Sequence, residues 1–198
     1  MDALIAAAGV LLAGAITPGP NNFVVLTAGA RAGFVGALPA LAGIVLGSVA
    51  LGIVAVLGAG ALFNAEPRLG VVTTGAGCVY LIWLGARALI ESAAPTQSAG
   101  HSHLPSHASG LFFFQFLNPK AWATVLTVTA AAQTEADVGR TGLLIGLFAL
   151  IPTVCLTIWA GLGSLTSEYL ARPRVAVWFQ RSMGAMLIIS ALLLWFRP

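Results

Sequence analysis

A short polar segment interrupts an apolar run near the start of the chain, and it consists of Thr17, Pro18, Gly19, Pro20, Asn21 and Asn22. Proline has no backbone N–H and clashes with the carbonyl one turn earlier, so a helix that reaches this segment must end and restart. The first turn of a restarted helix offers backbone N–H groups and a partial positive charge, which together bind anions. The segment therefore predicts a site for a carboxylate, with two asparagine amides beside it.

A second break of the same kind occurs in the second half of the chain, at Asn118, Pro119 and Lys120. Asn118 is suited to cap the new helix and Pro119 to take its first position. In the first break we expect Thr17 or Asn21 to act as the cap. Lys120 adds a full positive charge. A lysine can anchor a helix at the membrane surface, but an ionisable group inside an apolar segment indicates a functional site.

The composition places these breaks inside a membrane. The chain has 198 residues, of which 59% are hydrophobic and 8% charged, and its mean hydropathy is +0.96. A soluble domain carries about 25% charged residues, so this chain cannot cover a surface that faces water. We therefore expect an integral membrane protein whose solvent is the lipid bilayer. In hydrocarbon, a broken helix costs several kcal/mol unless protein or water satisfies the backbone, which favours a functional reason for both breaks.

Several classes of function are not supported by the sequence. The nine Lys and Arg residues form no basic run, so no nucleic-acid partner is expected. No phosphate-binding motif is present, and the apolar segments contain no catalytic triad or carboxylate pair, so we expect neither an enzyme nor a cofactor. Because Asp2 is charged and no Lys or Arg precedes the first apolar run, we expect no cleaved signal peptide.

Six apolar segments are present, each near the length of about 20 residues that crosses a bilayer. They span residues 3–30, 36–63, 69–90, 111–133, 141–163 and 175–196, and the two breaks lie in the first and fourth. The sequence therefore predicts an all-α polytopic membrane protein with six transmembrane helices.

We expect one transmembrane domain over residues 1–198, made of a first half 1–91, a polar loop 92–110 and a second half 111–198. Because each half has three segments, the halves enter the membrane from opposite sides, which is an inverted repeat common in transporters. Arginines are more numerous in the first, third and fifth connections. This bias predicts that these connections face the cytoplasm and that both termini face outside.

Four motifs give the chain a resemblance to a known family. TPGPNN, AGIVLG, GAGCVYLIWLGAR and FLNPKAW stand in the first four segments, and with the length and the central loop they resemble the lysine-exporter (LysE/RhtB) family of amino-acid exporters. Within it, the chain is most similar to the cysteine and O-acetylserine exporter branch. The resemblance implies a secondary exporter in the bacterial inner membrane that moves amino acids or their derivatives out of the cytoplasm, driven by the proton gradient.

The charge of the substrate follows from the acidic residues, which all lie in loops or at segment ends: Asp2, Glu66, Glu91, Glu135, Asp137 and Glu168. A cationic side chain in a low-dielectric site requires an acidic partner, so a neutral amino acid is favoured. The absence of an acid also leaves the proton carrier open. Lys120 is the titratable candidate at a break, and the amino group of the substrate is the alternative.

Two other functions remain as alternatives. His101, His103 and His107 in the polar loop would fit a divalent metal exporter, although no ligand set accompanies them within the apolar segments. A transmembrane accessory protein would not need either break. Cys78 and Cys155 lie in mid-segment, away from both breaks, and we expect buried, unreactive thiols. Trp122 is close enough to the second break to line a site.

Two pairs of glycines have the spacing that lets helix backbones approach closely in lipid. Gly43 and Gly47 form the first pair, and Gly142 and Gly146 form the second. We expect both pairs to pack within the chain. A seam between two copies of a homo-oligomer and a moving gate are the alternatives, so the oligomeric state stays open.

Overall fold

The computed structural model describes residues 2–59, 65–91, 107–132 and 138–195, and all regular structure in these ranges is helical. In chain order the elements are α1 (Asp2–Ile16), α2 (Pro20–Val54), the π-helix η1 (Ala55–Ala59), α4 (Pro67–Glu91), α5 (Ala108–Leu117), α6 (Pro119–Ala131), α7 (Val138–Leu165), α8 (Ser167–Leu170) and α9 (Pro173–Trp195). The predicted all-α fold is confirmed for this part of the chain.

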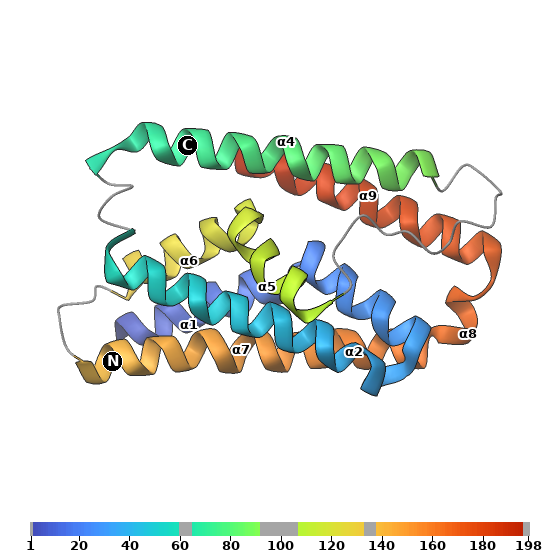
Figure 1. Ribbon diagram of the computed structural model, residues 1–198, viewed down its shortest axis with the longest axis horizontal. Coiled ribbons are helices and arrows are strands. Elements are labelled where there is room, and N and C mark those ends of the chain that lie inside the picture. The colour runs from blue at the N-terminus through green and yellow to red at the C-terminus, as the bar shows by residue number, and fades with distance from the viewer. Residues whose placement is uncertain (1, 60–64, 92–106, 133–137, 196–198) are drawn as a thin grey trace.

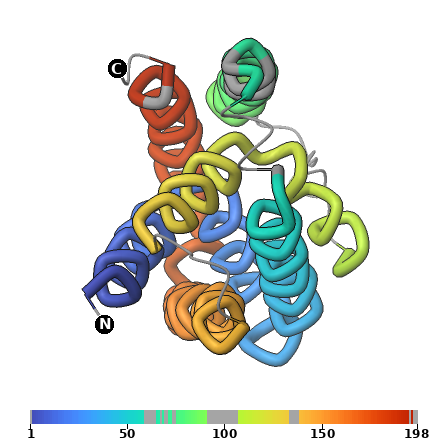
Figure 2. The backbone as a smooth tube through the Cα atoms, turned by 90° about the vertical axis from the view of Figure 1, so that its left-hand side faces the viewer, coloured from blue at the N-terminus to red at the C-terminus, as the bar shows by residue number. Residues whose placement is uncertain are grey.

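The long helices lie along one axis of the molecule (Figure 1). Seen end on, α4 and α9 form a pair at one edge, and α1, α2, α6 and α7 form a group beside it (Figure 2). Glycine allows the α4–α9 pair to come close. A Cβ atom on Gly85 would lie 2.6 Å from the Gly184 carbonyl oxygen, and one on Gly184 would lie 2.7 Å from that of Gly85.

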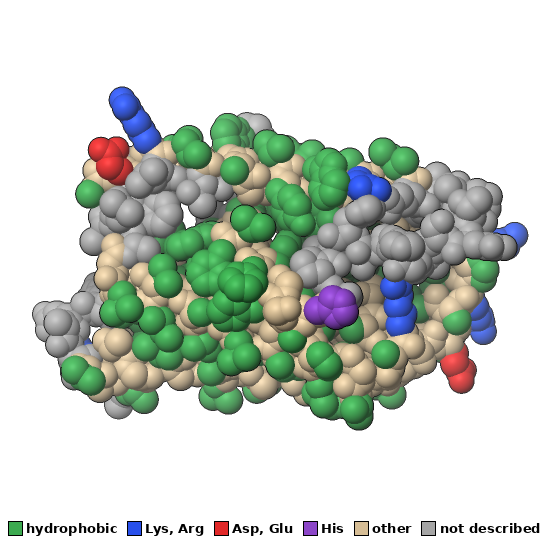
Figure 3. All heavy atoms as spheres, viewed as in Figure 1, with side chains coloured by type: hydrophobic (Ala, Val, Ile, Leu, Met, Phe, Trp, Pro, Cys, Tyr) green, Lys and Arg blue, Asp and Glu red, His purple; other side chains and the backbone are tan. Residues whose placement is uncertain are grey.

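Three helical stretches are long and apolar enough to cross a membrane, and they cover Pro20–Gly58, Val138–Leu165 and Pro173–Leu193. Shorter apolar helices cover Asp2–Ile16, Gly75–Ile90 and Ala108–Leu117. On the face shown in Figure 3, hydrophobic side chains dominate the middle, and the Lys and Arg side chains lie mostly toward the right-hand end. The structure is thus that of a helical membrane protein, and the number of six spans stays a prediction.

The boundaries differ from the prediction in two places. The first and second apolar segments are joined directly, because α2 continues through residues 31–35 with only Gly33 outside the helical conformation (φ 71°, ψ 175°). A positive φ is strained for residues with a side chain, so glycine makes this tight corner. The polar loop is shorter than the expected 92–110, since α5 begins at Ala108.

The glycine pair Gly43 and Gly47 packs within the chain, as predicted, and its partner is α5. A Cβ on Gly43 would collide with the carbonyl oxygen of Ala108, and one on Gly47 would lie 2.6 Å from that of Phe112. The same expectation is wrong for Gly142 and Gly146, because in the described part of the chain no atom beyond their own stretch of α7 lies within 4 Å of a Cβ built on either residue.

Candidate functional site

Both breaks are present, and each is followed by a helix that starts on proline. α1 ends at Ile16 and α2 begins at Pro20, while α5 ends at Leu117 and α6 begins at Pro119. Proline is tolerated at the first helical position because the N–H that it lacks has no partner there. Two helix ends and two helix starts therefore lie within the protein, and their backbone groups need other partners.

In the first break, the end of α1 is satisfied by a side chain from the next helix. The buried Asn22 donates from Nδ2 to the carbonyl oxygens of Ala15, at 3.1 Å, and Thr17, at 3.0 Å. Thr17 donates its own hydroxyl to the carbonyl of Ala13 and does not cap α2. The residue before α2 is Gly19, and no side chain caps the helix. The prediction that Thr17 or Asn21 caps it is wrong, because Thr17 is used by α1 and Asn21 lies inside the first turn.

In the second break, Asn118 caps α6 as predicted. Its Oδ1 accepts the backbone N–H of Lys120 at 3.1 Å, and the side chain is buried. Trp122 reaches back over the break and donates from Nε1 to the carbonyl oxygen of Phe116 at 2.9 Å. Trp122 therefore satisfies the end of α5 rather than lining the cavity described below.

The residue that follows each proline reaches into the other break. Lys120 Nζ donates to the carbonyl oxygens of Thr17, at 2.6 Å, and Pro18, at 3.3 Å. Asn21 Oδ1 accepts from Asn118 Nδ2 at 3.5 Å. Asn21 also forms a reciprocal pair with Gln115 of α5, in which Asn21 Nδ2 donates to Gln115 Oε1 at 2.9 Å and Gln115 Nε2 donates to Asn21 Oδ1 at 3.0 Å. The two breaks are therefore cross-linked in both directions, although about a hundred residues separate them in sequence.

Gln115 is the residue of this site that the sequence reasoning missed. It is fully buried in α5 and also donates to the carbonyl of Leu111 at 3.3 Å. The signal was available, because an amide in the apolar run LFFFQFL must find partners when it is buried. What the sequence could not give was the identity of that partner.

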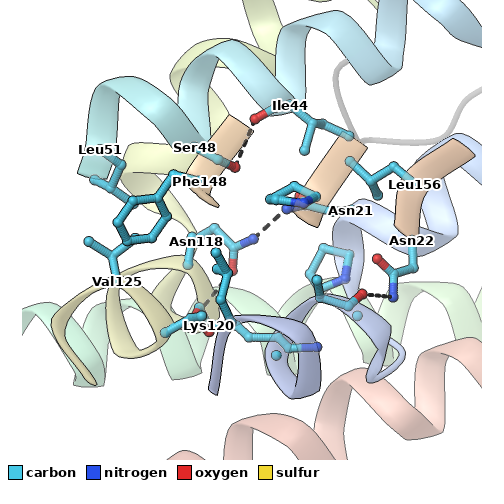
Figure 4. Close-up of a pocket in the computed structure, with 18 residues that line it drawn as sticks. Asn21, Asn22, Ile44, Ser48, Leu51, Asn118, Lys120, Val125, Phe148 and Leu156 are labelled. Carbon is cyan, nitrogen blue, oxygen red and sulfur yellow. Dashed lines mark hydrogen bonds between the residues drawn. The ribbon is translucent and has the colours of Figure 1, made fainter. Parts of the chain in front are cut away.

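A cavity of about 70 Å³ lies between the two breaks, among α1, α2, α6 and α7 (Figure 4). Since one water needs about 10–15 Å³ by this measure, the space holds on the order of five waters or a small organic molecule. Its polar lining consists of Asn21, Asn22, Ser48, Asn118, Lys120 and Thr124. Its larger apolar side chains are Leu11, Ile44, Leu51, Val125, Phe148 and Leu156.

Six of the nine predicted site residues line this cavity: Gly19, Pro20, Asn21, Asn22, Asn118 and Lys120. The other three lie in the same breaks without lining it. The carbonyls of Thr17 and Pro18 hold Lys120, and Pro119 packs against Gly77, where a Cβ would collide with its ring.

Hydrogen-bond donors gather at the polar end of the cavity. The Asn21 and Asn22 backbone N–H groups belong to the first turn of α2, which no side chain caps, so they lack a partner within their helix. Lys120 uses two of its three ammonium donors on the Thr17 and Pro18 carbonyls, which leaves one for a ligand. The lack of a side chain at Gly19 lets the Lys120 ammonium lie next to the start of α2, because a Cβ there would lie 2.9 Å from Lys120 Nζ.

The alternative features find little support in the part of the chain that the structure describes. No group of three His, Cys, Asp or Glu side chains that could hold a metal ion occurs there, and His101 and His103 lie outside it. Cys78 and Cys155 are buried free thiols that form no disulfide. Cys78 Sγ lies 3.3 Å from the Ala191 carbonyl oxygen. Neither cysteine lines the cavity between the breaks.

Comparison with known proteins gives a consistent result. The family model described as LysE type translocator matches residues 12–197. Proteins named cysteine/O-acetylserine efflux protein, from Escherichia coli strain K12, Shigella flexneri serotype 5b and Shigella sonnei, are 32% identical over 157 residues, which is 76% of this chain and 77% of theirs. No solved structure matches the chain. With a family match over nearly its whole length, the chain belongs to the LysE type translocators, and it is a multi-pass inner-membrane exporter rather than an enzyme.

Proposed function

We propose that this protein exports a small neutral amino acid from the cytoplasm, and that the cavity between the two helix breaks is its binding site. The observation that carries the proposal is the uncapped first turn of α2 with the Lys120 ammonium beside it. A carboxylate placed there would receive backbone N–H groups and a charged donor together. The cysteine/O-acetylserine relatives make cysteine and O-acetylserine the first substrates to test.

The neutral character of the substrate rests on the lining of the cavity. Lys120 is the ionised side chain among the described lining residues, and no Asp or Glu accompanies it. A carboxylate would balance the charge of Lys120, and the backbone carbonyls at the end of α1 offer partial negative charge to an amino group. A second cation on the substrate would have no counterion, and burying it would be costly.

We also propose that the chain crosses the membrane six times as two inverted halves. Support comes from the matched breaks, in which each proline begins a half-helix, and from the reciprocal contacts of Asn21 and Lys120 across them. The separation in sequence between Pro20 and Pro119 recurs in two pairs of glycines. These pairs are Gly43 with Gly142 and Gly47 with Gly146. One ancestral spacing would account for all three pairs.

Export against a concentration gradient needs an energy source, and we propose the proton-motive force. Lys120 is the titratable side chain that lines the cavity in the described part of the chain. Loss of its proton would weaken the hydrogen bonds that hold the Thr17 and Pro18 carbonyls, because they would no longer be assisted by the charge. Proton movement would thus change the contact between the two breaks. The amino group of the substrate remains the other candidate carrier.

The proposal is tested by efflux from proteoliposomes that contain the purified protein and are loaded with radiolabelled cysteine, O-acetylserine, serine, leucine or lysine. We expect efflux of cysteine, stimulated by a pH gradient, and none of lysine. Asn22→Ala and Asn118→Ala should each reduce efflux at least about tenfold, since each removes buried hydrogen bonds of a break. Thr127→Ala, an exposed site on α6, is the matched control. Normal efflux by both asparagine variants would refute the two-break site.

The metal-exporter alternative is tested with the same vesicles. Replacement of His101, His103 and His107 by alanine should leave amino-acid efflux unchanged. Efflux of Zn²⁺, Co²⁺ or Ni²⁺ that depends on these histidines, without any amino-acid efflux, would favour the alternative. An accessory protein would show neither activity and would keep its cellular role when both breaks are altered.

A further inference from the structure

The cavity has two ends of different chemistry. Leu51, Val125 and Phe148 lie together at one end, with Asn118 next to them, whereas Asn21 and Asn22 lie at the other end beside Leu156 (Figure 4). The three apolar side chains are buried and belong to one core cluster. If the breaks hold the groups that all amino acids share, the side chain of the substrate must point toward this apolar end.

Phe148 is held firmly at that end. Its side chain is 1% exposed, and its ring rests on the backbone of α2 at Gly52. A Cβ on Gly52 would lie 2.7 Å from Cδ2 and 3.0 Å from Cγ of the ring. The absence of a side chain at position 52 therefore lets the ring withdraw from the cavity, and the ring in turn sets how deep the cavity is.

The walls next to the apolar end carry only neutral polar groups. Ser48 donates its hydroxyl to the carbonyl of Ile44 at 2.9 Å, and Thr124 donates to that of Lys120 at 2.8 Å. Their donors are thus used within their own helices, and the oxygens retain acceptor capacity. This environment suits a short side chain that is apolar or carries one weak donor, such as a thiol or hydroxyl.

We propose that Phe148, seated on Gly52, limits the size of the substrate side chain and so determines specificity. This inference rests on the proposed export function. A side chain of two or three heavy atoms fits between the breaks and the ring, whereas a branched side chain such as that of leucine meets it. Removal of the ring opens the cavity, and a methyl group at position 52 pushes the ring into it.

The test measures the ratio of leucine to cysteine efflux from proteoliposomes loaded with both radiolabelled amino acids. Such a ratio does not depend on how much folded protein each preparation contains. We expect Phe148→Ala to raise it at least about tenfold, which is the discrimination that one or two methylene groups provide in an apolar pocket. Gly52→Ala should lower cysteine efflux while alanine efflux remains. Phe113→Ala, on an exposed ring of α5, is the control and should leave the ratio unchanged.

The outcomes separate this inference from the proposed function. Wild-type vesicles that export none of these amino acids would contradict the function itself. If the wild type exports cysteine and Phe148→Ala exports it with an unchanged ratio, the size limit lies elsewhere and the inference is wrong. Should Phe148→Ala fail to fold, Phe148→Leu removes part of the ring at smaller cost and must raise the ratio in the same direction.

A second inference comes from an asymmetry between the two glycine pairs. Gly43 and Gly47 are closed on α5, with Ala108 and Phe112 against them. The residue that corresponds to Gly43 in the other half is Gly142, and the one that corresponds to Ala108 is Gly9. Each pair has the same separation in sequence as Pro20 and Pro119. Among the described residues, no atom beyond their own helix turns lies within 4 Å of a Cβ built on Gly9, Gly142 or Gly146. The glycines of α2 are therefore packed against α5, whereas the corresponding glycines of α7 are not packed against α1.

The open contact adjoins a groove between the same two helices. It has a volume of about 260 Å³ and is lined by Leu4, Ile5 and Ala8 of α1 and by Leu143 and Leu147 of α7. On α7 this groove is lined by Leu143 and Leu147 and not by the two glycines. A rotation of α1 about α7 would bring it onto Gly142 and Gly146, where the small residues allow close approach.

We propose that transport exchanges these two arrangements. In the second state α1 closes on Gly142 and Gly146, while α5 separates from Gly43 and Gly47. The inference rests on the inverted halves proposed above, because such halves can exchange conformations around a fixed site. The cavity would then open first on one side of the membrane and then on the other.

Gly146→Leu tests this gate, with Gly161→Leu on the same helix as its control, since neither position has an atom within 4 Å of a Cβ. Both variants should keep the wild-type melting temperature, and Gly146→Leu alone should lose efflux at least about tenfold. Unchanged efflux would overturn the gate. A loss of efflux accompanied by a change in the mass of the detergent-solubilised particle would also overturn it, in favour of a seam between two copies.

Discussion

The ammonium group of Lys120 lies 2.6 Å from the carbonyl oxygen of Thr17, so the cation of the second break caps the helix end of the first. A positive charge at a helix C-terminus is favourable because it meets the negative end of the helix dipole. Lys120 is also one of the residues that line the cavity. Lys120 therefore joins the two breaks and borders the cavity between them.

Replacement of Lys120 by methionine keeps the length of the side chain and removes its charge. We expect efflux to fall at least about tenfold, because the carboxylate loses its charged donor. We also expect the remaining efflux to lose its stimulation by a pH gradient. Both are measured in proteoliposomes with and without the gradient. A Lys120→Met protein that exports normally and keeps its pH response would contradict both roles.

Gly19 is the point where a single methyl group should disturb the anion site. A Cβ at this position would lie 2.9 Å from Lys120 Nζ and 3.2 Å from Lys120 Cδ, so Gly19→Ala should displace the ammonium from the Thr17 and Pro18 carbonyls. We expect weaker substrate binding, seen as a several-fold higher KM for efflux. Gly161→Ala, which has open space around it, should behave like the wild type. An unchanged KM for Gly19→Ala would show that the ammonium position does not matter.

The reciprocal pair of Asn21 and Gln115 predicts energetic coupling between the breaks. Each single alanine variant removes the two hydrogen bonds of the pair and leaves the partner amide with only its remaining contact, to the Leu111 carbonyl for Gln115 and to Asn118 for Asn21. The double variant removes both amides. We expect a coupling free energy of about 1–2 kcal/mol from a double-mutant cycle on thermal or denaturant stability. A coupling near zero would indicate that water replaces the pair in solution.

The crossing of α2 and α7 offers a test of packing that does not involve the site. A Cβ on Gly163 would collide with the Leu26 carbonyl oxygen, whereas nothing lies within 4 Å of one on Gly161, two residues earlier in α7. We expect Gly163→Val to cost roughly 1–3 kcal/mol, a typical price of overpacking, and Gly161→Val to cost little. Melting temperatures of the two detergent-solubilised variants, compared with the wild type, provide the measurement.

The sequence by itself determined where the helices break and what each break exposes. Pro20 and Pro119 act on their own backbone and on the turn before it, so their effect needs no knowledge of the rest of the chain. The capping of α6 by Asn118 is equally local. The apolar composition likewise required a membrane, because too few charged residues are present to cover a surface in water.

Only the tertiary structure decided which groups from the two halves meet. Three contacts depend on how helices far apart in sequence pack. They are the contact of Lys120 with Thr17, the pair of Asn21 and Gln115, and the packing of Phe148 on Gly52. It also decided that α2 has no side-chain cap. The residue before it is Gly19, and the Thr17 hydroxyl donates to the Ala13 carbonyl of α1 instead. Local chemistry fixes where backbone groups lose their partners, whereas the packing of the whole chain fixes which distant atoms replace them.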